Sequence, residues 1–266
     1  MDGIPSSIDW SGVREVIARA ERDGAVIGAA IRAPSGEPFR HNASRRFVAA
    51  STVKVPLMIA LFREIDAGRR GLSDPYRLAN ADRALGSGVM LHLHEGIEFT
   101  LGDLVYLMIS ISDNTATNVL IDLVGMPAVN AVMRDLGMAG SSLERKMQGR
   151  AAEPGAAENW AVPEEYAAML AALLGNRVAA PASCAAMITY LEKQQNERRI
   201  ARFLPREEKP RWGSKTGSVP GVVNDVGFIE TAHGMLILSI FCEKIDPHSG
   251  EEVIGEISRA ALAALG

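Results

Sequence analysis

Cysteine is scarce in this sequence, neither sign of charge dominates it, and long apolar runs are missing. The chain of 266 residues contains two cysteines, Cys184 and Cys242, in an apparent helix and an apparent strand. They indicate neither a disulfide framework nor a metal site, so we expect both to be core residues. The net charge of −4 gives no indication of nucleic acid or an anionic membrane surface as a partner. No apolar run reaches the length of a membrane span, since even residues 235–242 have only the length of a strand.

The sequence also shows neither a secretory signal nor a set of metal ligands. Residues 1–7 have neither the basic nor the apolar region of a secretory signal. We therefore expect a cytoplasmic protein as the sequence is written, and a periplasmic or secreted one if the N-terminus has been trimmed. His92 and His94 would point apart on a helix and have no evident third ligand, so we expect no metal. We also expect no cofactor, no nucleic acid or membrane partner, and a monomer.

The patterns that are present predict an α+β protein. Hydrophobic content of 47% and charged content of 23% suit one large domain or two intimate sub-domains. Strand patterns lie near both ends of the chain, at 25–32, 38–41, 210–216, 222–230 and 234–243. Between them the patterns are almost all helical, including 101–110, 114–124, 127–136 and 163–174. We expect a five-stranded antiparallel sheet covered by N- and C-terminal helices, formed by 1–42 and 195–266, with a helical sub-domain inserted at 43–194.

A serine and a lysine stand three residues apart at the start of the most apolar helical pattern. Ser51 and Lys54 would lie on one helix face, one turn apart. Burial disfavours a charged ammonium, so such a lysine can take the proton of the serine. By chance Ser-x-x-Lys occurs about once in a chain of this length. The alternative is an ordinary core helix with a capping serine and a lysine that reaches for solvent.

Two further polar motifs each have a structural alternative. Ser112-Asp113-Asn114 lies in an expected turn between helices, where it can present side chains to a cleft or simply cap a helix. Lys215-Thr216-Gly217-Ser218 ends a strand pattern, where it can bind a carboxylate or simply guard a sheet edge. Each tripeptide, Ser-Asp-Asn or Lys-Thr-Gly, has a chance frequency of roughly one in several thousand per position. The combination in this order is therefore a strong signal.

This trio is typical of class A β-lactamases and penicillin-binding proteins. The chain resembles the penicillin-recognising serine hydrolases, and class A β-lactamases most closely. The likeness covers nearly the whole chain, with further similar segments at 86–89, 98–104, 112–120 and 223–226.

The resemblance implies a role for each motif residue during acylation. Ser51 would be the acylated nucleophile, and Lys54 would accept its proton. Ser112 would relay a proton to the leaving nitrogen, and Asn114 would hold the substrate amide and help to position Lys54.

The resemblance also implies a carboxylate site and an oxyanion hole. Lys215, Thr216, Gly217 and Ser218 would form the carboxylate site of the substrate. The backbone N–H groups of Ser51 and Ser218 would stabilise the tetrahedral oxygen.

One element of the class A pattern is missing. Class A enzymes carry Glu-x-x-Leu-Asn in a loop, and its glutamate activates the water that releases the acyl group. Residues 143–145 resemble the start of this loop, which would place the glutamate near Met147, a residue that cannot act as a base. The loop offers Glu153, Glu158 and Asn159 instead. Glu158 and Asn159 are either a substitute pair reached by a different loop path or a structural pair.

These residues predict a serine hydrolase that forms an acyl-enzyme with a small amide or ester, most simply a class A-type β-lactamase. If the deacylating base is lost, the alternatives are an esterase, peptidase or acyltransferase of the same superfamily. A β-lactam sensor and a degenerate interaction fold remain as further alternatives.

Overall fold

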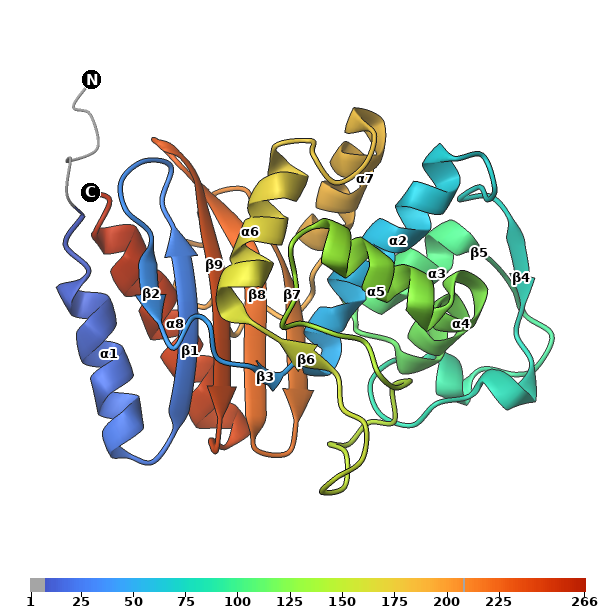
Figure 1. Ribbon diagram of the computed structural model, residues 1–266, viewed down its shortest axis with the longest axis horizontal. Helices are drawn as coiled ribbons and strands as arrows, with labels where there is room; N and C mark the ends of the chain where they lie inside the picture. Colours follow the sequence, from blue (N-terminus) through green and yellow to red (C-terminus); the bar gives the residue numbers. More distant parts are fainter. Residues whose placement is uncertain (1–7, 208) are drawn as a thin grey trace.

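The computed structural model describes residues 8–207 and 209–266. Within these residues, five strands form an antiparallel sheet beside a group of helices (Figure 1). The order of the strands across the sheet is β2 (Phe39–His41), β1 (Val26–Arg32), β9 (Gly234–Glu243), β8 (Val222–Thr231) and β7 (Trp212–Val219). Two short strand pairs lie outside it: β3 (Phe47–Val48) with β6 (Trp160–Ala161), and β4 (Pro75–Arg77) with β5 (Glu98–Thr100). The predicted α+β fold with its antiparallel sheet is confirmed.

The sheet is buried on both faces. Leu236, Leu238 and Ile240 of β9 belong to a core formed with α1 (Ser11–Arg22) and α8 (Pro247–Ala263), whereas Ile237 and Phe241 belong to the core of the helical region. Successive side chains of a strand point to opposite faces, so this double burial explains the continuous apolar run. The terminal helices cover one face as predicted, and α6 (Pro163–Leu174) packs on the other.

The helical region is organised around a buried central helix, α2 (Lys54–Asp66), which follows the 3₁₀ helix η1 (Ala50–Val53). Every α2 residue from Lys54 to Phe62 is buried, which confirms the expectation from its apolar pattern. The other helices of this region are α3 (Leu101–Ser110), α4 (Asn114–Val124), α5 (Met126–Asp135) and α7 (Pro181–Glu192), with 3₁₀ turns at Asn80–Asp82 and Met90–His92. Both cysteines are buried and free, as expected.

Two details differ from the sequence-based expectation or extend it. Strand β7 continues to Val219, so Lys-Thr-Gly lies inside the strand and not at its end, because β7 pairs with β8 over its whole length. In the described part of the chain no single helix is long and apolar enough to cross a membrane; the bent pair α4 and α5, at 83°, meets that criterion by length and composition only. The division into 1–42 plus 195–266 and 43–194 stays a prediction.

Candidate active site

The segment that carries Ser51 is fixed to the sheet. Ser51 lies half-buried in η1. The preceding Ala50 has a φ of +46°, in the left-handed region that residues with a Cβ seldom adopt. Asn224 of β8 donates from Nδ2 to the backbone oxygens of Val48, at 2.9 Å, and Ala49, at 3.2 Å. The Ala49 oxygen also accepts from the amide and the hydroxyl of Thr52, at 3.1 and 2.8 Å. The backbone before the nucleophile candidate is therefore held by the sheet as well as by its own helix.

Lys54 begins α2 one turn after Ser51, and its amine is fully buried. Nζ lies 2.8 Å from the backbone oxygen of Ser112, 3.0 Å from Ser112 Oγ and 2.9 Å from Asn114 Oδ1. Burial lowers the pKa of Lys54 well below its usual value, and the charge of Lys215 lowers it further, while Asp113 opposes the shift. The predicted association of Lys54 with Ser112 and Asn114 is thus present, around an amine that loses its proton readily.

Asp113, the middle residue of Ser-Asp-Asn, holds the backbone around it. Its Oδ1 accepts from the Ala116 amide at the start of α4, as a helix cap. Its Oδ2 accepts from the amides of Val89 and Met90. A Cβ on Gly88 would lie 2.2 Å from the same carboxylate, so glycine permits the close approach. The capping interpretation is therefore correct for Asp113, while its two neighbours contact Lys54.

Lys215 of β7 is a second fully buried lysine. Its Nζ donates to the backbone oxygen of Thr216 at 2.8 Å. Burial lowers the pKa of Lys215 to about 7; the nearby Asp225 opposes this shift and Arg199 adds to it. At neutral pH this lysine is therefore balanced between a charged form that can attract a carboxylate and a neutral form.

Gly217 allows β7 to touch the nucleophile segment. A Cβ at this position would lie 3.1 Å from the Ser51 amide nitrogen and 3.0 Å from the Ala49 oxygen, which are backbone atoms that cannot move aside. The glycine thus keeps the amides of Ser51 and Ser218 on neighbouring segments, the arrangement that an oxyanion hole requires.

Ser51 lies where two cavities meet. One, of about 70 Å³, is lined by Ser51, Asn114, Met147, Glu158 and Ser218, with other residues of the loop 145–150. The other, of about 590 Å³, is lined by Ser51, Ser112, Thr216, Ser218 and the segment 194–199. Lys54, Lys215 and Gly217 lie behind these walls, in contact with residues that form them.

Met147 lies on the cavity wall at the position expected for the missing glutamate. It is 9% exposed, and Asn118 binds both of its backbone groups. Asn118 Nδ2 donates to the Met147 oxygen at 3.0 Å, and the Met147 amide donates to Asn118 Oδ1 at 2.8 Å. The backbone of residue 147 is therefore fixed beside the cavity, and its side chain carries no group that could act as a base.

Glu158 also lines this cavity, but its carboxylate is bound within its own loop. Arg145 donates to it through Nε and Nη2, both at 2.9 Å, and the amides of Ala152 and Asn159 donate at 2.7 and 2.8 Å. Burial acts to raise the pKa of Glu158, but these hydrogen bonds outweigh it and lower the pKa. Asn159 in turn binds the backbone of Arg145. These contacts favour the structural alternative, and catalysis by Glu158 stays a prediction.

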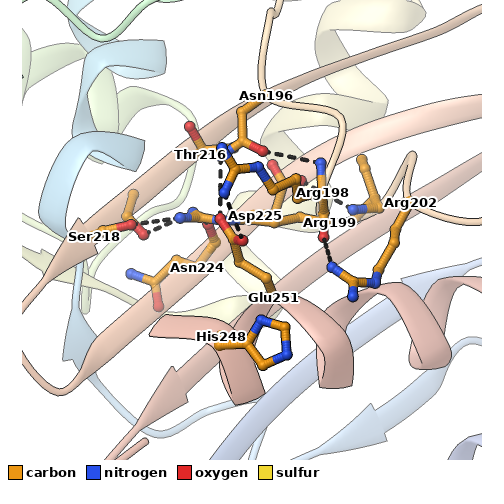
Figure 2. Close-up of polar contacts among 12 residues, drawn as sticks. Asn196, Arg198, Arg199, Arg202, Thr216, Ser218, Asn224, Asp225, His248 and Glu251 are labelled. Carbon is orange, nitrogen blue, oxygen red and sulfur yellow. Dashed lines mark hydrogen bonds and ion pairs between the residues drawn. The ribbon is translucent and has the colours of Figure 1, made fainter. Parts of the chain in front are cut away.

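Arg199 is a site residue that the sequence did not reveal. It is 5% exposed and donates to the backbone oxygens of Gly217 and Asn224 and to Ser218 Oγ. Figure 2 shows it between Ser218 on β7 and Glu251 on α8. A pair of arginines at 198–199, between the expected helical region and the strand pattern at 210–216, is the only signal that the sequence offers for it. Burial lowers the pKa of Arg199, and the carboxylates of Asp225 and Glu251 oppose that shift.

Comparison with known proteins agrees with this geometry. The family model of the beta-lactamase enzyme family matches residues 11–265. The crystal structure of a beta-lactamase from Sphaerobacter thermophilus is 61% identical, with a TM-score of 0.95, and covers 97% of this chain and 98% of that one. A reconstructed ancestral class A β-lactamase is 26% identical over 96% of this chain and 100% of its own, with a TM-score of 0.87. A beta-lactamase of Rhodobacter capsulatus is 36% identical over 134 residues, which are 49% of this chain and 45% of that protein.

The matched range spans the sheet, the central helix and all three motifs. The chain therefore belongs to the beta-lactamase enzyme family, as a serine hydrolase of class A type.

Proposed function

We propose that the protein hydrolyses the amide bond of β-lactams through an acyl-enzyme at Ser51. The observation that carries this proposal is the buried amine of Lys54, one turn from Ser51 and in contact with Ser112 and Asn114. A lysine with a lowered pKa is a suitable proton acceptor for a serine nucleophile.

Acylation then requires one proton to travel from the nucleophile to the leaving group. Lys54 takes the proton of Ser51 as Oγ attacks the carbonyl carbon, and the amides of Ser51 and Ser218 stabilise the oxyanion. The carbon–nitrogen bond of the tetrahedral intermediate breaks, and Lys54 returns the proton through Ser112 Oγ, 3.0 Å away, to the leaving nitrogen. Lys215 and Thr216 hold the substrate carboxylate during both steps.

Deacylation is the slower half of this reaction. Water needs a general base within hydrogen-bond reach, whereas Met147 occupies the expected place and Arg145 engages the carboxylate of Glu158. The acyl-enzyme is therefore the species that accumulates. The same observation favours a second candidate, an esterase, peptidase or acyltransferase whose acyl-enzyme reacts with an acceptor better than water.

Intact-protein mass spectrometry over a time course with a chromogenic cephalosporin tests the proposal. We expect an adduct on Ser51 that forms rapidly and decays as hydrolysed product appears. Ser51→Ala should abolish the adduct and the turnover, whereas Ser87→Ala, which alters another serine of the cleft wall, should retain both. Labelling of Ser51→Ala at another residue would refute the assignment. A stable adduct without turnover would favour the second candidate.

A further inference from the structure

The two cavities that meet at Ser51 differ in size and in the segments that line them. The smaller, of about 70 Å³, ends at the loop that carries Met147 and Glu158. The larger, of about 590 Å³, runs from Ser51 past Ser112 to the segment 194–199. Because they share only part of their walls, the two sides of a bound amide would meet different chemistry.

The proposed function fixes which side of the substrate lies in the larger cavity, and the inference rests on it. Ser112 gives a proton to the leaving nitrogen, and Thr216 contacts the carboxylate on the ring that contains this nitrogen. Both residues line the larger cavity. The leaving-amine portion of the substrate therefore points toward the segment 194–199, and the acyl portion points toward Asn114 and Met147.

The far end of the larger cavity carries an excess of positive charge. Arg198 and Arg199 share one carboxylate, Glu251, at 3.9 and 3.6 Å, and Asn196 donates to the same carboxylate at 3.4 Å. Figure 2 shows these side chains grouped around Glu251 beside β7. The neighbouring Glu197 forms an ion pair with Lys209 at 2.8 Å, so its charge does not neutralise the positive charge of Arg198 and Arg199.

Of the two arginines, Arg198 has the more accessible guanidinium. Arg199 is buried and directs its donors to Gly217, Asn224 and Ser218. Arg198 is 77% exposed, and its 3.9 Å contact with Glu251 is longer than a hydrogen bond. An anion on the leaving-amine portion could thus bind the Arg198 guanidinium without breaking a hydrogen bond to any residue in 8–207 or 209–266.

We propose that Arg198 forms a second anion subsite, which selects substrates whose leaving amine carries an acidic group in addition to its carboxylate. The first anion subsite, at Lys215 and Thr216, holds the carboxylate, and Arg198 holds the additional group at the end of the cavity. Because Arg198 is exposed, its contribution is a preference of a few-fold and falls as salt screens the charges.

Two cephalosporins with the same acyl side chain test the subsite, one with a sulfonate and one with a pyridinium on the C3 substituent. This substituent belongs to the ring that contains the leaving nitrogen. The measurement is the second-order rate constant for acylation of Ser51, expressed as the sulfonate-to-pyridinium ratio. We expect Arg198→Gln to lower the ratio about threefold and Arg198→Glu about tenfold. Added salt should lower the ratio in the parent protein and change it little in Arg198→Gln.

Arg206→Gln is the matched control, because Arg206 is exposed on the same loop and shares a neighbouring cavity with Arg198, but does not line the larger cavity at Ser51. It removes the same charge and should leave the ratio unchanged. If both Arg198 variants acylate with the parental ratio, the subsite is overturned while the proposed function stands. If Arg206→Gln lowers the ratio as much as Arg198→Gln, the preference comes from net charge and the subsite is also overturned. If neither cephalosporin acylates Ser51 in the parent protein, the proposed function fails and the subsite fails with it.

Discussion

Replacing Met147 by glutamate should supply the base that the deacylation step lacks. Residue 147 lines the same cavity as Ser51, and Asn118 fixes its backbone through two hydrogen bonds of 2.8 and 3.0 Å. Methionine and glutamate are both unbranched and of similar length, so a carboxylate would enter the cavity without moving the backbone. The cavity volume of about 70 Å³ exceeds the ~15 Å³ that a water molecule needs on this measure.

The expected gain is that of one general base. Positioned proton transfer typically contributes about 10²–10⁴-fold, so Met147→Glu should raise the deacylation rate constant by about that factor. Acylation should change less than about threefold, because Lys54 and Ser112 keep their contacts. Burial raises the pKa of the introduced carboxyl, so the gain should be lost as pH falls through this raised value.

The assay separates the two steps. The protein is acylated with one equivalent of a penicillin, the excess is removed, and loss of the adduct mass is followed in time. Met147→Gln is the control, with the same shape and polarity but no base, and should deacylate at the parental rate. Equal deacylation rates in the parent protein, Met147→Glu and Met147→Gln would refute residue 147 as the place from which water is activated.

Three other perturbations test the same site. The kcat/KM for acylation should depend on pH with a bell-shaped profile. It should rise as Lys54 loses its proton and fall through about pH 7 as Lys215 loses its charge. A kcat/KM that continues to rise up to pH 9 would contradict these assignments. Glu158→Gln breaks the buried ion pair with Arg145. It should lower the free energy of unfolding, measured by denaturant titration, by about 3 kcal/mol. A tenfold slower deacylation in the folded variant would instead identify Glu158 as the base. Gly217→Ala would place a Cβ 3.1 Å from the Ser51 amide nitrogen. We expect acylation to slow about tenfold, because overpacking of this kind typically costs ~1–3 kcal/mol. An unchanged acylation rate would show that β7 can move away from Ser51 without disturbing the oxyanion hole.

Much of the fold could be predicted because its signals are local. Helices α3, α4 and α6 begin and end where the helical patterns at 101–110, 114–124 and 163–174 place them. The strand order could not be read in the same way. The pairing of β1 with β9, for example, joins residues more than 200 positions apart, and no local pattern specifies such a partner.

In the candidate site, too, the residues that belong to short motifs could be predicted, and those placed by distant contacts could not. Ser51, Lys54 and Ser112 could be predicted because their chemistry follows from short motifs. The partners of Glu158 could not, because the path of the loop 145–159 depends on contacts such as that of Asn159 with the backbone before Ser51. The position of the Arg199 side chain likewise depends on contacts with β7 and α8, which are distant from it in the sequence.

The attachment of the nucleophile segment to β8 has a consequence for how activity arises during folding. Asn224 joins the backbone at 48–49 to the sheet, and β7 completes the wall beside Ser51, so each half of the chain holds only part of the catalytic apparatus. A partly folded form with a native central helix but a detached sheet would therefore not be acylated at Ser51. Covalent labelling of Ser51 would report the docking of the two halves, and two separately produced fragments would regain labelling only by reassembling.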